Sequence, residues 1–201
     1  MIINWYGENC FKLQTGGITI LIDPFESGNG LTPPRFKADI TLYTTTSLPL
    51  SNDDITPGTI KGPGEYEIKG VHVFGWMLEK TESEIRSAYT VKTEDFTLSF
   101  LGNPKNIPGP ETAEHAIGAD IVFIPVGGAP SLDGTAAAKV VKQLSPKIVI
   151  PSAFKISGLT RKADSVSGFL KELGQEATPQ EKLTIKKKEV PQSTQAIVLS
   201  I

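Results

Sequence analysis

Few residues in this chain have side chains that commonly bind transition metals. Its 201 residues include two histidines, His72 and His115, and one cysteine, Cys10. A catalytic zinc normally takes three protein ligands from histidine, cysteine, aspartate or glutamate. The histidines form neither a His-x-His nor a His-x-x-x-His pattern. We therefore predict no metal and no cofactor, and structural or surface roles for both histidines.

Other catalytic signatures are also missing from the sequence. Cys10 stands in a β-type segment without a neighbouring cation or helix start to lower its pKa, so we predict a buried core thiol. There is no Gly-x-Ser-x-Gly pattern for a serine nucleophile and no Gly-x-x-x-x-Gly-Lys loop for phosphate. The sequence thus predicts none of the standard catalytic arrangements.

Short apolar runs separated by glycine and proline predict a mixed α/β protein. Ile18–Ile22 is typical of a buried strand and ends in Asp23, while Ile40–Tyr43 opens into a loop over 44–51 that carries no charge. We expect Asp23 to accept backbone N–H bonds in its loop or to line a site. Further strands are predicted over 2–6, 10–14, 71–74, 88–93, 97–101, 121–125, 148–150, 183–187 and 195–199, with an exposed loop over 77–87.

Two segments of the second half have the apolar spacing of helices. Ala137, Val140, Val141 and Leu144 recur on one face of a helix predicted over 133–144. A second helix is predicted over about 164–173, because Gly174 is a typical helix stop. A strand, helix, strand unit is therefore expected in this half.

Length and charge limit the classes of partner. We predict one domain over residues 1–201, because the chain is long enough for one core and short for two. Net charge is −2 with interspersed signs, which argues against nucleic-acid binding. No segment has the roughly 20 apolar residues of a membrane helix, and the start has no basic leader. We expect a cytoplasmic protein that does not bind membranes.

Six short motifs carry a resemblance to a known family. In order and spacing they resemble the metallo-β-lactamase-fold superfamily, in particular its compact bacterial branch of metal-dependent hydrolases related to the L-ascorbate-6-phosphate lactonases. The resemblance covers the whole chain and implies a four-layer αβ/βα sandwich with its site at one edge of two sheets. The motifs are WYGENCF at 5–11, DPF at 23–25, KADI at 37–40, GPGEYE at 62–67, IPVGG at 124–128 and PKIVIP at 146–151.

The resemblance also implies where relatives hold their metals. Their His-x-His-x-Asp-His motif corresponds to Thr45, Ser47, Pro49 and Leu50 here. A Gly-Asp pair corresponds to Gly102-Asn103, and a later histidine corresponds to Ala153, while Glu8 stands where many relatives carry histidine or glutamine. Hydroxyl groups are poor neutral zinc ligands, and proline and leucine cannot ligate. We therefore interpret Thr45, Ser47, Pro49, Leu50, Asn103 and Ala153 as vestigial metal-site positions.

Three hypotheses about function remain open. The first is a metal-free pseudoenzyme that binds an unknown small molecule or protein partner through Glu8, Asp23, Thr45, Ser47 and Asn103. The alternative is a hydrolase with an atypical site, in which Glu8 or Asp23 acts as general base or holds a hard cation such as Mg²⁺. The third is an assembly role in a homo-oligomer, with 48–50 packing against a neighbouring chain.

Overall fold

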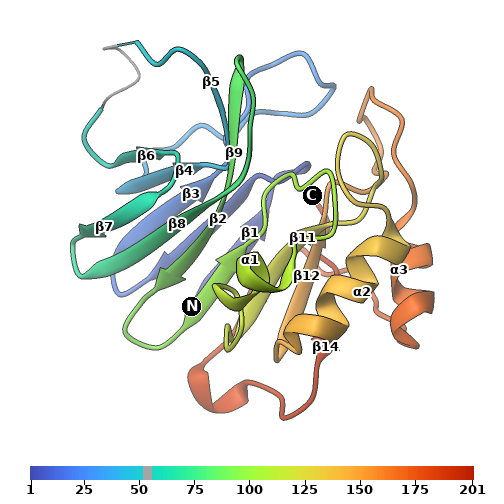
Figure 1. Cartoon of the computed structure of the whole chain (residues 1–201). Helices are drawn as coiled ribbons and strands as arrows, with labels where there is room; N and C mark the ends of the chain where they lie inside the picture. Colours follow the sequence, from blue (N-terminus) through green and yellow to red (C-terminus); the bar gives the residue numbers. More distant parts are fainter. Residues whose placement is uncertain (52–55) are drawn as a thin grey trace.

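Two β-sheets pack face to face in the computed structural model, which describes residues 1–51 and 56–201 (Figure 1). In spatial order, the six-stranded sheet of this described part consists of β13 (Lys182–Thr184), β1 (Ile2–Trp5), β2 (Phe11–Thr15), β3 (Ile18–Ile22), β4 (Ile40–Tyr43) and β6 (Thr59–Lys61). The eight-stranded sheet consists of β14 (Gln195–Ala196), β12 (Ile148–Ser152), β11 (Ile121–Pro125), β10 (Thr97–Phe100), β9 (Glu84–Lys92), β8 (Val71–Lys80) and β7 (Gly64–Ile68), with β5 (Thr45–Ser47) paired to β9.

The helices belong to the second half of the chain. They are α1 (Pro110–Glu114), α2 (Gly134–Leu144) and α3 (Val166–Leu173), followed by the 3₁₀ helix η2 (Lys187–Glu189). Helices α2 and α3 pack against each other and lie beside the β11–β12 part of the eight-stranded sheet (Figure 1). This is the α/β sandwich that the sequence predicts. In the described part of the chain, no helix combines the length and apolar character needed to cross a bilayer.

The core forms where the inner faces of the sheets meet. Strand β1 alternates between buried and partly exposed residues, whereas every residue of β11 and β12 is buried, as expected for parallel strands covered on both faces. The ring of Phe11 in β2 lies 4.8 Å from that of Phe123 in β11, which in turn stacks on Phe100 at 4.2 Å. Burial of each such ring contributes about 1.5–3 kcal/mol, and the Phe11–Phe123 contact joins the two sheets.

The ends of α2 and α3 follow from local sequence. The side chain of Asp133 accepts a hydrogen bond from the Ala136 N–H and caps α2, and Ser165 caps α3 in the same way. Gly174 ends α3 in the left-handed conformation that glycine adopts without strain. Both predicted helices are therefore confirmed to within two residues.

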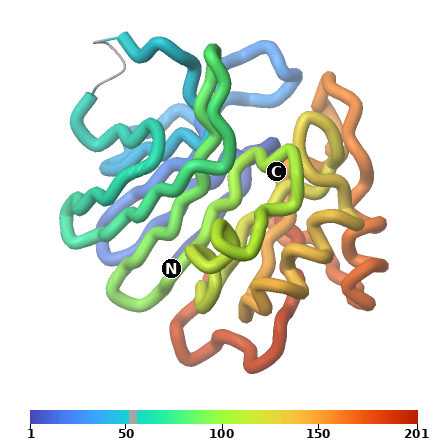
Figure 2. Tube along the Cα trace, viewed as in Figure 1, coloured from blue at the N-terminus to red at the C-terminus, as the bar shows by residue number. Residues whose placement is uncertain are grey.

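The N-terminal strand pairs with a strand from the last part of the chain. Strand β13 pairs with β1, and the Met1 amino group donates to the Ile185 carbonyl oxygen at 2.8 Å. Figure 2 shows the C-terminal segment, in red, running back toward the N-terminal strand, in blue. The predicted strand over 183–187 was too long, because η2 begins at Lys187, and the strand predicted over 195–199 ends at Ala196.

Two predicted loops are strands. The segment predicted as an exposed loop over 77–87 continues β8 and begins β9, so the two strands form one long hairpin with an irregularity between Met77 and Glu79. Residues 45–47, predicted within a loop, form β5 on the same hairpin. Neither segment was predicted as a strand, because its side chains are largely polar. Its strand conformation depends on cross-strand pairing rather than on apolar alternation.

Candidate functional site

A pocket of about 280 Å³ lies at the edge where the loops after several strands of both sheets converge. Parallel strands carry their C-terminal ends to one edge, so residues far apart in sequence meet there. Loops after β3, β10, β11 and β12 contribute to it, together with the loop between β1 and β2. The lining residues are Glu8, Asn9, Asp23, Phe25, Asn103, Pro130, Ser131, Ala153 and Arg161.

Asp23 is the acidic group with the most perturbed environment in this pocket. One carboxylate oxygen accepts from the Thr44 N–H at 2.6 Å and the other accepts from the Thr44 hydroxyl. Burial raises the pKa of Asp23 to about 6, although both hydrogen bonds from Thr44 act in the opposite direction. Asp23 is therefore mostly ionised at pH 7 and close to its titration range.

Glu8 and Arg161 form an ion pair across the pocket. The Arg161 Nε and one terminal nitrogen donate to the two Glu8 carboxylate oxygens, each at 2.7 Å. Arg161 also donates to the Ala153 carbonyl oxygen. The two side chains are 26% and 25% exposed, so the pair is shielded from solvent only in part. The pocket thus contains a guanidinium cation whose charge is balanced by Glu8.

Asn9 joins three loops through its side-chain amide. Its Nδ2 donates to Asn103 Oδ1 at 2.8 Å and to the Gly102 carbonyl oxygen at 3.3 Å. Its Oδ1 accepts from the Ser152 hydroxyl at 2.6 Å. Asn103 in turn donates to the Thr45 hydroxyl at 3.4 Å. A continuous polar network therefore links β5, the loop after β1 and the ends of β10 and β12.

Left-handed backbone conformations concentrate at the pocket. Glu8, Asp23 and Ala153 have φ angles of 48°, 42° and 56°. Such conformations cost non-glycine residues of order 1–3 kcal/mol and persist where surrounding contacts impose them. A Cβ on Gly102 would lie 2.5 Å from the Thr44 Cβ and 2.9 Å from the Ser87 carbonyl oxygen, so glycine is required immediately before Asn103. The backbone around the pocket is therefore closely constrained.

The predicted ligand-pocket residues separate into two groups. Glu8, Asp23 and Asn103 line the pocket, and Thr45 contacts it through Asn103. Ser47 is exposed and pairs with Glu84 in the β5–β9 ladder, outside the lining.

The other positions interpreted above as vestigial lie in different surroundings. Ala153 lines the pocket, whereas Pro49 and Leu50 are exposed, with Leu50 42% accessible. Leu50 therefore does not fill the space between the loops. Phe154 is buried and its ring lies 4.6 Å from that of Trp5, so it belongs to the core beside the pocket.

The side chains present do not fit a transition-metal centre. The pocket has no histidine or cysteine among its lining residues, and both Glu8 oxygens accept hydrogen bonds from Arg161. Within residues 1–51 and 56–201, no group of three or more His, Cys, Asp or Glu side chains is placed to hold a metal ion. A hard cation would have to compete with Arg161 for the Glu8 carboxylate. The other carboxylate in the pocket lining is that of Asp23.

The histidines and the cysteine lie elsewhere. His72 is exposed and lies 3.6 Å from a Glu67 carboxylate oxygen. His115 lies with its ring 5.1 Å from that of Phe74 and 5.3 Å from that of Trp76. Cys10 is fully buried, and burial, followed by the charge of Asp23, raises the pKa of its thiol far above neutrality. These environments agree with the core thiol that the sequence predicts.

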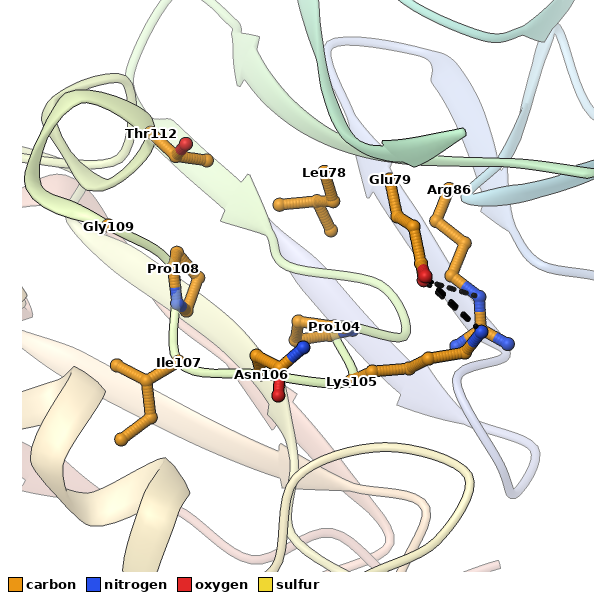
Figure 3. Close-up of a pocket in the computed structure, with 10 residues that line it drawn as sticks. All are labelled: Leu78, Glu79, Arg86, Pro104, Lys105, Asn106, Ile107, Pro108, Gly109 and Thr112. Carbon is orange, nitrogen blue, oxygen red and sulfur yellow. Dashed lines mark hydrogen bonds and ion pairs between the residues drawn. The ribbon is translucent and has the colours of Figure 1, made fainter. Parts of the chain in front are cut away.

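A second pocket, of about 200 Å³, lies between the β8–β9 hairpin and the loop after β10. Figure 3 shows Glu79, Arg86 and Lys105 gathered at one end, with Ile107 and Pro108 toward the other. Arg86 donates to Glu84 at 2.8 Å, and Lys105 lies 3.3 Å from Glu79. Arg86 also donates to the Asn103 carbonyl oxygen, so this charge cluster supports one wall of the first pocket.

Sequence reasoning missed three polar residues that build these pockets. Asn9, Arg86 and Arg161 belong to no catalytic motif, and each acts on residues distant in the chain. The one available signal for Asn9 was its place inside the WYGENCF motif. Nothing comparable marks Arg161, which stands among other charged residues.

The fold of this chain is that of a known family. Residues 2–153 match the family model described as a β-lactamase superfamily domain, which covers most of the chain. The chain belongs to this superfamily. The predicted resemblance and the metallo-β-lactamase fold are thereby confirmed, whereas the loss of metal ligands stays a prediction.

Some of the similar proteins are named as hydrolases. A UPF0173 metal-dependent hydrolase of a Geobacillus species is 28% identical over 192 residues, covering 75% of this chain and 84% of the relative. A UPF0173 protein of Pyrococcus abyssi is 25% identical over 197 residues, covering 86% and 90%.

Solved structures of similar proteins agree on the fold. A Thermotoga maritima protein, proposed to be a zinc-dependent hydrolase of the metallo-β-lactamase superfamily, superposes with a TM-score of 0.81 at 25% identity, covering 98% of this chain and 97% of the other. A metallo hydrolase of Ignicoccus hospitalis has a TM-score of 0.69 at 13% identity, covering 92% and 99%, and shows likeness of fold alone.

Proposed function

We propose that this superfamily member is a hydrolase with a carboxylate-based site, in which Asp23 acts as general base. The observation that carries the proposal is a carboxyl group with a pKa of about 6 in the wall of the pocket between the two sheets. General bases work best when their pKa lies near the operating pH, and strongly perturbed groups in clefts are typical of functional sites. The names of the relatives support a hydrolase more than a non-catalytic role.

The other polar groups of the pocket fit a small polar ester as substrate. Ionised Asp23 accepts a proton from water while the water oxygen bonds to the acyl carbon. The bond to the leaving group then breaks, and the proton passes to the leaving oxygen. Asn103 and Arg161 line the pocket, and their N–H groups donate to Thr45 and to Lys162. A substrate that took over such a bond would have the negative charge that develops on its acyl oxygen stabilised. The volume of about 280 Å³ limits the substrate to a small molecule.

The test is hydrolysis of a panel of p-nitrophenyl carboxylate esters by the full chain and by Asp23→Asn. The substitution keeps the shape of the side chain but removes the base, so kcat/KM should fall by at least about 100-fold. The wild-type rate should rise with pH through about 6, as Asp23 loses its proton.

Asp133→Asn is the matched control for this test. Asp133 caps α2, and asparagine caps helices equally well, so activity should not change. Equal rates for wild type and Asp23→Asn would contradict the role of Asp23, and a wild type without turnover on the whole panel would favour the second candidate.

The second candidate is a non-catalytic protein that binds a small molecule or a protein partner in the same pocket. It is favoured by the pairing of both carboxylates, since Glu8 is held by Arg161 and Asp23 by Thr44. In such a protein, wild type and Asp23→Asn would both hydrolyse the esters only at the background rate. Ligand-dependent changes in Trp5 fluorescence would persist in the variant. Trp5 lies beside the pocket, because its indole N–H donates to the Glu8 carbonyl oxygen at 2.9 Å.

A further inference from the structure

The loops of the pocket are tied together by the side chains of this chain. The family resemblance places metal ligands after β4, β10 and β12, where one metal centre would connect loops from both sheets. Here those loops lack a suitable set of donors among the described residues. The contacts that connect them are instead hydrogen bonds and one ion pair, in which Asn9, Ser152 and Arg161 join residues that the resemblance singles out to residues that it does not.

Asn9 makes the central connection. It comes from the six-stranded sheet, between β1 and β2, and its partners Asn103 and Ser152 follow or end strands of the eight-stranded sheet. Asn9 is 8% exposed and Ser152 is 1% exposed. Both Nδ2 hydrogens and the Oδ1 atom of Asn9 have partners, so the buried amide is satisfied. Fully satisfied buried networks rigidify the parts that they connect.

The Glu8–Arg161 pair makes a second connection beside the first. Glu8 is the neighbour of Asn9, and its carbonyl oxygen accepts from the Ala153 N–H at 3.0 Å. Arg161 then reaches both the Glu8 carboxylate and the Ala153 carbonyl oxygen. A fixed guanidinium therefore stands among the loops where the resemblance implies a metal cation, and it neutralises Glu8 in the way a metal would.

We propose that the Asn9 network and the Glu8–Arg161 pair fasten the two sheets in place of a metal, so that the folded protein neither needs nor gains stability from zinc. The proposal concerns the architecture of the pocket. It stands apart from whether Asp23 catalyses hydrolysis, because its test measures unfolding and metal content.

The first experiment uses the wild-type chain. Its Tm should change by less than about 1 °C on addition of EDTA or of excess Zn²⁺, because a ligand stabilises a fold only by binding to it. Elemental analysis of protein purified without added metal or a nickel column should find well under one transition metal per chain. A bound stoichiometric metal, or a Tm that falls by more than about 5 °C in EDTA, overturns the proposal.

The second experiment removes the network. Asn9→Leu keeps the branched arrangement of heavy atoms, with bulkier methyl groups, but leaves Ser152 and the Gly102 carbonyl without their partner, so Tm should fall by at least about 5 °C. Asn106→Leu is the matched control at an exposed position, with an expected change below about 1 °C. Should Asn9→Leu not fold, Ser152→Ala removes one donor from the network and should lower Tm by about 2–4 °C. Variants no less stable than Asn106→Leu would overturn the role of Asn9.

Discussion

Two carboxylates, Asp23 in the pocket between the sheets and Glu84 beside the second pocket, have opposite environments. In the pocket between the sheets, Asp23 faces hydrogen-bond donors from Thr44, and burial raises its pKa to about 6. Beside the second pocket, on the β8–β9 hairpin, the hydrogen bond from Arg86 lowers the pKa of Glu84, and the charges of Arg86 and Lys105 add to this effect. A carboxylate that forms ion pairs with Arg or Lys supports structure. A carboxylate that is buried without such an ion pair can act as a general base. Glu8, paired with Arg161, and Glu84, paired with Arg86, are therefore supporting carboxylates, whereas Asp23 is the candidate for chemistry.

The largest effect on stability is expected at Arg86. Its side chain is 9% exposed and serves Glu84 together with the Asn103 carbonyl oxygen. Arg86→Met should lower the free energy of unfolding by about 2–3 kcal/mol, because hydrogen bonds to a buried charge are lost and buried carbonyls remain. Lys105→Met, at a side chain 40% exposed, should cost under about 1 kcal/mol. Urea unfolding of both variants measures the difference, and equal losses would contradict a supporting role specific to Arg86.

The pH dependence of stability should have opposite signs in the two pockets. The folded pKa of Asp23 lies above its ordinary value of 3.8, so its contribution is present at low pH and is lost as pH rises to about 6. Relative to wild type, Asp23→Asn should therefore gain up to about 3 kcal/mol between pH 4 and pH 7.

Glu84→Gln gives the opposite expectation. The pKa of Glu84 lies below its ordinary value of 4.5, so its contribution is present at neutral pH and is lost as pH falls through the lowered pKa. Relative to wild type, this variant should lose stability as pH rises. Urea unfolding at pH 4, 5, 6 and 7 tests both signs, and parallel curves for the two variants would remove the contrast between the pockets.

A smaller effect is expected for the ion pair of the first pocket. Arg161→Gln should lower the free energy of unfolding by about 1 kcal/mol, since solvent screens a pair that is one quarter exposed. Arg161→Lys keeps the charge but loses the two-pronged contact with Glu8, so it should restore only part of the loss. Complete recovery by lysine, measured in the same urea series, would show that the geometry of the contact is unimportant.

The smallest effect is expected at Leu50. Its side chain is 42% exposed, so Leu50→Glu should change the free energy of unfolding by less than about 0.5 kcal/mol. The same variant tests the proposed homo-oligomer. An unchanged mass by light scattering would argue against an interface at 48–50, whereas a mass that falls to that of one chain would support it.

Local sequence predicted the elements that depend on local physics. Short apolar runs identified β3 and β11, and helical apolar spacing together with the Gly174 stop identified both longer helices, because burial and a helix end are encoded within a few neighbours. It failed at 77–87 and 45–47, where charged and hydroxyl side chains lie on strands that exist through pairing with each other. Their conformation is a property of the hairpin as a whole.

The same distinction between local sequence and tertiary pairing applies to the candidate site. The sequence alone determined that the chain has two histidines and one cysteine, and that Thr45, Asn103 and Ala153 stand at the positions implied by the family motifs. Only the tertiary structure decided which polar groups meet. Ser152 contacts Asn9 across 143 positions of sequence, and Arg161 contacts Glu8 across 153. Such contacts are set by the packing of two sheets against each other, and no local pattern records which loops that packing brings together.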